Sequence, residues 1–287
     1  MSAFAAPLLF QNHPNLAFDV PRLMAIMNAT PDSFSDGGLL YKKDRIDRDA
    51  TLFRLQQVVA EGADIVDIGG ESTRPGASAI SVQEEMDRVL PVLELAVAET
   101  DLAISIDTSS PELMREAAKK GAHLINDVRA LSRPGAVEAA ASTGLPVCLM
   151  HMQGTPASMQ VSPNYKDVVR DVVCYLQSRI DVCVNAGIDS TRICIDPGFG
   201  FGKTLEHNLL LLKYLSELKK LGCPLLVGLS RKSMIDHLLR RDLKDRLPAS
   251  LGLGLMSLER GANILRVHDI RETRDIIDSF VAVRCCD

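Results

Sequence analysis

The sequence predicts an α/β protein that folds as one (β/α)8 barrel of the TIM type. The chain has 287 residues, of which 46% are hydrophobic and 24% charged, enough for a barrel of the typical ~250 residues with a substantial core. Eight short apolar runs alternate with stretches of helical period, and no linker or low-complexity segment divides them. Both observations favour a single domain. A doubly wound open sheet is the second interpretation, although the Gly-rich dinucleotide turn of such sheets is missing.

The predicted strands are short runs that are mostly rich in Val, Ile and Leu. Near-continuous apolar runs are typical of parallel strands that are covered on both faces. The strands are predicted at residues 23–27, 64–68, 103–106, 123–125, 146–150, 192–195, 224–229 and 263–267.

Amphipathic stretches between the strands predict the surrounding helices. They span residues 48–61, 82–100, 111–120, 166–186, 205–221, 247–260 and 271–283. Ser81 ahead of Glu84 predicts a capping box, and Ser110 before Pro111 predicts an N-cap with proline in the first turn. Glycine follows five of these stretches, where a helix C-terminus favours it: Gly62, Gly121, Gly187, Gly222 and Gly261.

Residues 1–21 precede the predicted barrel domain, 22–283, as a flanking segment. Their apolar stretch is short, and no Lys or Arg precedes Arg22, so neither a secretory signal nor a membrane span is predicted. We expect this segment to form a β-hairpin that closes the bottom of the barrel.

The charge and the cysteines bound the function classes. A formal net charge of −5 argues against nucleic-acid binding, which needs an excess of Lys and Arg. The seven cysteines form no C-x-x-C pair and predict buried free thiols in a cytoplasmic protein. They are Cys148, Cys174, Cys183, Cys194, Cys223, Cys285 and Cys286.

Polar residues collect where the predicted strands end, and the amino ends of the strands show no such enrichment. They are Asn28, Glu71-Ser72-Thr73-Arg74, Asp107, Asn126-Asp127, His151, Asp196, Ser230-Arg231-Lys232-Ser233, Arg266 and His268. Because the active sites of this fold lie at the carboxyl ends of the strands, these residues predict a catalytic mouth.

Asp107, Asn126 and Asp196 supply two carboxylates and an amide to this mouth. Such groups can recognise the N–H-bearing edge of a polar heterocycle. The same three residues could instead bind a metal. A zinc site is disfavoured, because the chain has no H-x-x-x-H pattern and no clustered Cys/His spacing.

The segment DPGFGFGKT, residues 196–204, matches neither glycine-rich phosphate motif. Pro197 stands where a P-loop needs glycine, and Lys203 stands where a dinucleotide loop needs one. We interpret its glycines as letting the backbone pass close to a flat ligand, with Phe199 or Phe201 packing on it.

Arg266 and His268 occupy alternate positions on the last predicted strand, so their side chains share one face. The ends of the last two strands are the usual phosphate site of these barrels, and Ser233 starts a helix nearby, where N–H groups bind anions. The alternative for Arg266 is a salt bridge to Asp269 or Glu272.

Eight motifs, in chain order from about Arg22 to Asp275, carry a resemblance to a known family. They are NATPDSFSDGG, VDIGGESTRPG, ISIDTS, INDVRAL, PVCLMHMQGTP, DPGFGFGKT, VGLSRKSMI and RVHD. In this order they resemble the dihydropteroate synthase family, the folate-pathway enzymes that sulfonamides inhibit. The resemblance implies a barrel that uses Mg²⁺ to join 4-aminobenzoate to dihydropterin pyrophosphate, giving dihydropteroate and pyrophosphate.

The resemblance also assigns residues to ligands. It implies that Asn28, Arg266 and His268 hold the pyrophosphate, with Asn28 reaching Mg²⁺. The pterin ring is expected to contact Asp107, Asn126, Asp196, Lys232, Met150 and Phe201. The aminobenzoate is expected to contact Thr73, Arg74, Pro75, Phe34 and Ser233. The residues expected to carry the chemistry are Asp36, Lys232, Asn28, Arg266 and His268.

For the chemical step we hypothesise that pyrophosphate leaves first and that Asp36 stabilises the methylene cation that remains. No covalent enzyme nucleophile is required. Loops 30–38 and 71–78 are expected to close over the ligands, and the resemblance implies a homodimer through the last two helices.

Two rival functions are a methyltransferase domain that binds a folate and a catalytically inactive pterin-binding barrel. The SRKS, TRPG and RVHD segments speak against the former, and the retained chemical residues against the latter.

Overall fold

The structure is a computed structural model, and it describes residues 7–10, 13, 16–30, 40–42, 45–72, 80–155 and 158–286. Eight parallel strands within these residues form the sheet. They are β1 (Arg22–Asn28), β4 (Ile65–Gly69), β5 (Ala103–Asp107), β6 (Leu124–Asp127), β7 (Val147–Met150), β8 (Ile193–Asp196), β9 (Leu226–Val227) and β10 (Ile264–Val267). All eight predicted strands are present, with ends that differ by at most two residues.

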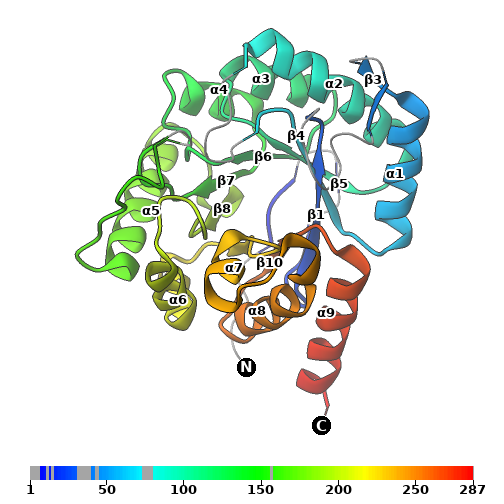
Figure 1. Ribbon diagram of the computed structural model, residues 1–287. Helices are drawn as coiled ribbons and strands as arrows, with labels where there is room; N and C mark the ends of the chain where they lie inside the picture. The colour runs from blue at the N-terminus through cyan, green and yellow to red at the C-terminus, as the bar shows by residue number, and fades with distance from the viewer. Residues whose placement is uncertain are drawn as a thin grey trace.

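The sheet closes into a barrel. Its strand order is β8-β7-β6-β5-β4-β1-β10-β9, and a parallel bridge between Ile195 and Leu225 joins β8 to the start of β9. Figure 1 shows the helices arranged around the strands, with α1 and α9 on the same side of the barrel. The predicted (β/α)8 barrel is therefore confirmed, and the open doubly wound sheet is excluded.

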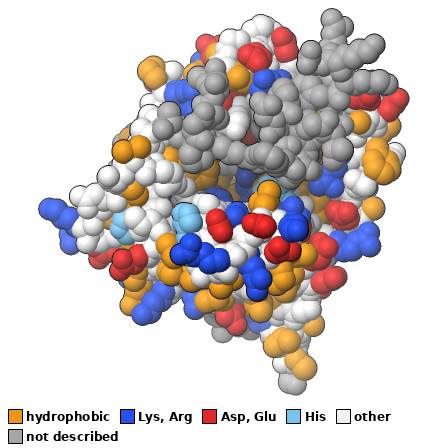
Figure 2. Space-filling model, in the orientation of Figure 1, with side chains coloured by type: hydrophobic (Ala, Val, Ile, Leu, Met, Phe, Trp, Pro, Cys, Tyr) orange, Lys and Arg blue, Asp and Glu red, His pale blue; other side chains and the backbone are white. Residues whose placement is uncertain are grey.

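Nine α-helices of the described chain cover the outside of the barrel. They are α1 (Arg48–Ala60), α2 (Val82–Glu99), α3 (Pro111–Lys119), α4 (Ala136–Thr143), α5 (Val168–Asn185), α6 (Leu205–Lys213), α7 (Ser233–Leu239), α8 (Leu247–Glu259) and α9 (Ile270–Arg284). Shorter elements are the two-stranded pair β2 (Tyr41–Lys42) and β3 (Arg45–Ile46) and the 3₁₀ helices η2 (Ser190–Arg192), η3 (Leu215–Leu221) and η4 (Leu243–Asp245). Figure 2, in the same orientation, shows a hollow above α7 and α8, with Lys, Arg, Asp and Glu side chains along its lower edge.

Helix ends follow the predicted local chemistry with two differences. Ser81 accepts the Glu84 N–H at 3.1 Å, but Glu84 turns its carboxylate to Arg88 at 2.5 Å instead of completing the box. The predicted helix 205–221 is interrupted at Tyr214, where α6 ends and a 3₁₀ helix begins. Helix α4 was not predicted from the sequence, because its alanines give no clear apolar stripe.

Side chains on the strands alternate between the barrel interior and the surrounding helices, as the period of two requires. The lowest inward layer is wholly apolar and packs with Leu8 and Phe18 of the N-terminal segment, which are 0% and 2% exposed. Its strand members are Met24, Ile65, Ala103, Leu124, Cys148, Cys194, Leu226 and Ile264. Leu8 also pairs with Leu16 in an antiparallel bridge, so this segment covers the amino end of the barrel. Residues 1–6, 11, 12, 14 and 15 lie outside the described residues, and the complete hairpin stays a prediction.

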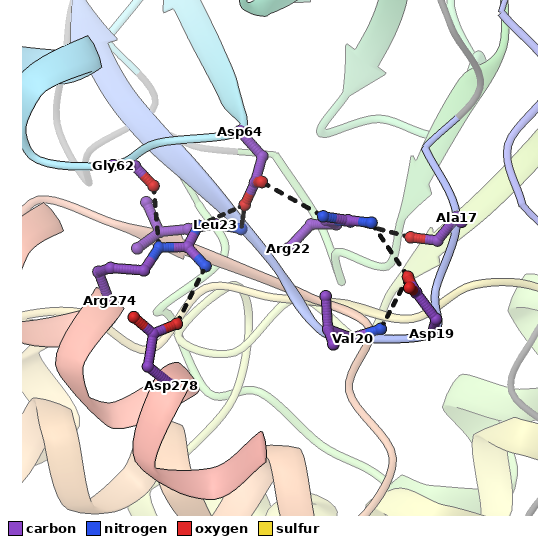
Figure 3. Close-up of polar contacts among 9 residues, drawn as sticks. All are labelled: Ala17, Asp19, Val20, Arg22, Leu23, Gly62, Asp64, Arg274 and Asp278. Carbon is purple, nitrogen blue, oxygen red and sulfur yellow. Dashed lines mark hydrogen bonds and ion pairs between the residues drawn. The ribbon is translucent and has the colours of Figure 1, made fainter. Parts of the chain in front are cut away.

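The amino ends of the strands hold a polar network that the sequence analysis did not anticipate (Figure 3). Asp64, ahead of β4, accepts the Leu23 N–H at 2.7 Å and pairs with Arg274 of α9 at 2.5 Å. Arg22 reaches the other Asp64 oxygen at 3.5 Å and donates to the Ala17 carbonyl at 2.9 Å. The network therefore ties the last helix and the N-terminal segment to the first two barrel strands, and the expectation of no polar enrichment at this end is wrong.

Candidate active site

One cavity of about 820 Å³ lies at the carboxyl end of the barrel. All the described residues that were assigned to a ligand or to the chemistry line it, although they come from strands far apart in the sequence. They are Asn28, Asp107, Asn126, Met150, Asp196, Phe201, Lys232, Ser233, Arg266 and His268. Of the other polar residues expected at the mouth, Asp127 and His151 do not line it. The remaining predicted site residues, Phe34, Asp36, Thr73, Arg74 and Pro75, lie outside the described residues, as does most of loops 30–38 and 71–78.

Arg266 lies across the floor of this cavity between two carboxylates. Its Nε donates to Asp67 Oδ2 at 2.6 Å and its Nη2 donates to Asp107 Oδ2 at 2.9 Å. Asp269 pairs instead with Arg231, whose Nε donates to it at 2.9 Å. The ion pairs of Arg266 within the described residues are with Asp67 and Asp107, so neither alternative salt bridge, to Asp269 or to Glu272, forms. The two carboxylates raise the pKa of Arg266 despite its burial, and the guanidinium stays charged.

Asp107 is poised between its charged and neutral forms. Burial raises its pKa to about 7, with Asp67 adding to the rise and Arg266 opposing it. A carboxyl group with a pKa near neutrality can either accept or donate a hydrogen bond in the working range of pH.

Asp67 is a site residue that the sequence analysis missed. It is fully buried, and its Oδ2 accepts from both Arg266 and the Asn126 amide, the latter at 3.1 Å. Its Oδ1 and the Ser105 hydroxyl on the neighbouring strand are buried without a hydrogen-bond partner in the described structure. The signal was available: an acidic residue at an inward-facing position inside an apolar strand needs a cationic or N–H partner.

Asp196, at the end of β8, and Lys232, after β9, form the neighbouring part of the cavity wall. Asp196 Oδ1 accepts the Gly198 N–H at 2.7 Å, and burial raises the pKa of the carboxyl against the opposing charge of Lys232. The Lys232 amine donates to the Phe199 carbonyl and lies 4.4 Å from the centre of the Phe201 ring. Burial lowers its pKa to about 8, while Asp196 opposes that change.

The glycines after β8 allow two loops to pack backbone against backbone. A Cβ at Gly198 would lie 1.9 Å from the His151 carbonyl oxygen, and one at Gly202 would lie 2.5 Å from the Gln153 carbonyl oxygen. Both glycines also have positive φ, 68° and 60°, which other residues rarely adopt. The close approach that these two glycines permit is thus to the loop after β7, not to the cavity.

The two phenylalanines of this segment have different places. Phe199 is fully buried in the core, whereas Phe201 lines the cavity. Of the two aromatic residues that could pack on a flat ligand, the structure therefore leaves Phe201.

Lys203 and His151 form a second buried polar group that was not predicted. The Lys203 amine lies 2.9 Å from His151 Nδ1, and both side chains are almost fully buried. Burial lowers the pKa of His151 to about 3, with the nearby Lys203 charge adding to the effect. His151 is therefore a neutral acceptor that ties the loop after β7 to the loop after β8.

Cationic and hydroxyl groups line the side of the cavity next to α7. His268 Nδ1 lies 3.1 Å from the Ser230 hydroxyl, and the His268 N–H donates to the same oxygen at 3.2 Å. Ser233 begins α7, with Lys232 at the N-cap position. His237 of α7 also lines the cavity.

A magnesium ion fits this cavity only if a bound substrate supplies the rest of the ion's coordination shell. The described residues contain no group of three or more His, Cys, Asp or Glu side chains that could hold a metal. Asn28 lines the cavity with an amide oxygen, and Mg²⁺ is commonly bound through one or two protein oxygens plus substrate phosphates and water. The donor set thus suits an ion that arrives with a phosphorylated ligand.

Two whole-chain expectations can be compared with the described residues. None of the helices described is long and apolar enough to cross a membrane. All seven cysteines are free; Cys148, Cys183, Cys194 and Cys223 are buried, whereas Cys174, Cys285 and Cys286 are exposed. The prediction of buried thiols holds for four of them.

The chain is similar to known enzymes over almost its full length. The family model described as "Pterin binding enzyme" matches residues 24–268. The dihydropteroate synthase of Escherichia coli (strain K12) is 51% identical over 265 residues, which covers 92% of both chains.

Solved structures agree. A crystal structure of Yersinia pestis dihydropteroate synthase with a sulfonamide drug complex has a TM-score of 0.92 and 47% identity, covering 97% of this chain and 100% of that one. Dihydropteroate synthase from Xanthomonas albilineans in complex with 7,8-dihydropteroate has a TM-score of 0.84 and 44% identity, covering 95% and 97%.

Proposed function

The chain belongs to the dihydropteroate synthase family of pterin-binding enzymes, and from that premise we propose how its cavity performs the reaction. The activity is a transfer in folate biosynthesis. Dihydropterin pyrophosphate and 4-aminobenzoate are condensed to 7,8-dihydropteroate, and pyrophosphate is released. The observation that carries the proposal is the convergence of Asp196, Asn126, Lys232 and Arg266 on one cavity.

The pterin ring lies against Asp196, Asn126 and Lys232. The second oxygen of Asp196 has no partner among the described residues, and the Asn126 amide oxygen is likewise unengaged, because its Nδ2 is used by Asp67. Two acceptors beside an amine donor complement a ring edge that carries N–H groups next to a carbonyl. Met150 and Phe201 line the same part of the cavity and supply apolar contacts for the faces of the ring.

The pyrophosphate lies toward Arg266, His268 and Asn28. Arg266 is held in place by Asp67 and Asp107 through Nε and Nη2, which leaves Nη1 without a partner among the described residues. A guanidinium with free N–H groups suits a phosphate oxygen. Asn28 would hold Mg²⁺, which when bound would supply a Lewis acid that neutralises charge on the leaving group.

The aminobenzoate lies near Ser233, at the side of the cavity formed by α7. Ser233 lines the cavity, and its hydroxyl can donate to a carboxylate. Thr73, Arg74, Pro75 and Phe34 complete this subsite in our proposal on the strength of the family resemblance alone.

The reaction proceeds by loss of pyrophosphate before attack. The bond between the pterin methylene carbon and the ester oxygen breaks, and both electrons leave with pyrophosphate. The neutral amine of aminobenzoate then forms the new C–N bond to the methylene cation and releases a proton to solvent. Arg266 and His268 stabilise the charge on the departing oxygens, and Asp36 stabilises the cation.

Asp36→Asn tests the role of Asp36. We expect the affinity for dihydropterin pyrophosphate to change little and kcat to fall, because the carboxylate acts only while the cation exists. The measurement is the KM and kcat of both substrates. Unchanged turnover would reject the role.

The rival functions are separated by one incubation. The protein is mixed with dihydropterin pyrophosphate, 4-aminobenzoate and Mg²⁺, and the products are weighed by mass spectrometry. Dihydropteroate and pyrophosphate are expected. A folate-dependent methyltransferase or an inactive pterin-binding barrel would form neither.

We further propose that the enzyme is a cytoplasmic homodimer that pairs through α8 and α9. The buried free thiols support a reducing compartment, and Met256 of α8 and Val283 of α9 are exposed apolar residues, at 39% and 80%. Light scattering on the purified chain measures the mass, and a monomer would contradict this arrangement.

A further inference from the structure

Lys203 is a buried amine that the proposed reaction does not use. It belongs to the glycine-rich segment 196–204, and its side chain is only 3% exposed. Burial lowers its pKa well below the usual value. A lysine is rarely kept in such a place unless its amine has several partners.

The amine has a partner for each of its N–H bonds. Three acceptors lie within 3.0 Å: His151 Nδ1 at 2.9 Å, the Gly198 carbonyl at 2.8 Å and the Phe201 carbonyl at 3.0 Å. His151 is neutral, so its Nδ1 can accept. Three acceptors match the three donors of an ammonium group, and a neutral amine would leave one acceptor unpaired.

The carbonyls that Lys203 binds belong to the turn that holds Lys232. Gly198 and Phe201 bracket this turn, and the Phe201 N–H donates to the Gly198 carbonyl at 3.1 Å. Between them, the Phe199 carbonyl accepts from the Lys232 amine. The Phe201 ring lies 4.4 Å from the same amine.

Two other carbonyls of the turn accept hydrogen bonds from other side chains, so they do not depend on Lys203. Gln160 donates to the Gly200 carbonyl at 2.6 Å, and Tyr165 donates to the Gly202 carbonyl at 2.7 Å. The Phe201 carbonyl has Lys203 as its partner. Without the amine this partly buried carbonyl loses the hydrogen bond that holds it in the turn.

We propose that Lys203 is a positioning residue for pterin binding: the hydrogen bonds of its amine fix the 198–201 turn so that the Phe199 carbonyl and the Phe201 ring hold Lys232 against the pterin. Lys203 borders the cavity, but its amine is hydrogen-bonded to His151 and to the carbonyls of this turn, and we infer that it acts through Lys232. The inference deepens the proposed function and rests on the assignment of Lys232 to the pterin.

A double-mutant cycle tests the coupling. The variants are Lys203→Met, Lys232→Met and the double variant, and the readout is the Kd for 7,8-dihydropteroate by titration calorimetry. Lys203→Gln is a milder version of the first, since its amide keeps N–H donors. Lys213→Met is the matched control, because Lys213 is an exposed lysine at the end of the helix that follows the same segment.

The expected result is a strongly non-additive cycle. Loss of a charge-assisted hydrogen bond changes a binding constant by about 10- to 100-fold, so Lys203→Met should raise the Kd about 10-fold and Lys232→Met about 100-fold. The double variant should stay within about 3-fold of Lys232→Met alone, because Lys203 then has nothing to position. Lys203→Gln should fall between wild type and Lys203→Met, and Lys213→Met should match wild type.

Three outcomes would overturn the proposal. A double variant about 1,000-fold weaker than wild type, the product of the two single effects, would make Lys203 an independent structural residue. A wild-type Kd in Lys203→Met would show that Lys203 positions nothing. If neither Lys203 variant shows a cooperative unfolding transition near the wild-type Tm, Lys203 is needed for folding and not specifically for positioning Lys232. If Lys232→Met itself binds dihydropteroate normally, the proposed pterin site fails first, which separates the two claims.

Discussion

Asp67→Asn perturbs the floor of the cavity with almost no change in shape. Asp67 is fully buried and holds Arg266 at 2.6 Å and Asn126 at 3.1 Å through one oxygen. Asparagine can keep a carbonyl oxygen in that place, but it removes the negative charge. Arg266 then depends on Asp107 alone, at 2.9 Å.

The expected loss of activity follows from the removal of one of the two carboxylates that pair with Arg266. Removing one side of a buried ion pair costs about 3–5 kcal/mol, and the contact with Asp107 and the remaining neutral hydrogen bond offset part of this. A net loss of about 2–3 kcal/mol corresponds to roughly 30- to 150-fold in kcat/KM for dihydropterin pyrophosphate.

The pH dependence supplies a second readout with a definite sign. The charge of Asp67 helps to raise the pKa of Asp107 to about 7. In Asp67→Asn that contribution disappears, while Arg266 continues to lower the pKa of Asp107. The acidic limb of the kcat/KM profile should therefore move to lower pH, because Asp107 stays ionised further into acid.

The assay is steady-state kinetics from pH 5 to 9 with saturating aminobenzoate. Asp278→Asn is the matched control, because Asp278 is 67% exposed and pairs only at 3.7 Å with Arg274; it should stay within about 2-fold of wild type. If kcat/KM of Asp67→Asn is within about 3-fold of wild type and the acidic limb of its pH profile does not move, Asp67 does not hold Arg266 in its working position.

Three further predictions concern separate parts of the molecule. The amine of Lys232 has a pKa of about 8, so we expect kcat/KM of the wild type to fall above pH 8. In Lys232→Met this fall should be absent in a profile to pH 10. If it persists, another group causes it. Arg274→Met breaks the contact with Asp64 at 2.5 Å, so urea unfolding should show a free energy of unfolding lower by about 2 kcal/mol with kcat unchanged. An unchanged free energy of unfolding would contradict a stabilising role of this ion pair. Burial lowers the pKa of His123 to about 4, and its Nδ1 accepts the Ile104 N–H at 3.0 Å. Because unfolded histidine titrates near ~6.5, stability should hold above that pH and fall toward pH 4, and the Tm of His123→Gln should depend less on pH across this window.

The sequence predicted the fold well because the barrel depends on strong local patterns. Apolar strand runs and helix-ending glycines recur around the whole chain, and Gly62 and Gly261 have the positive φ, 87° and 98°, that their places require. The weak points were elements without such patterns. The alanines of α4 give no apolar stripe, and no helix-ending residue marks the change from α6 to a 3₁₀ helix at Tyr214.

The candidate site was predicted in part, for a physical reason. Residues at strand ends, such as Asp107 and Asp196, are visible because an ionisable group interrupts an apolar run. Asp67 and Lys203 were missed because their importance depends on which partners the barrel brings to them, 199 and 52 residues away in sequence. The polar network at the amino end was missed likewise, since Asp64 meets Arg274 only when the barrel closes.

The central claim is that one cavity grips the pterin at Asp196, Asn126 and Lys232 and the pyrophosphate at Arg266 and His268. A crystal structure of this chain with dihydropterin pyrophosphate and Mg²⁺ tests it most directly. The account predicts ring nitrogens within hydrogen-bonding distance of Asp196 and Asn126, and phosphate oxygens on Arg266. A ring bound outside this cavity, or phosphates remote from Arg266 and His268, would contradict it.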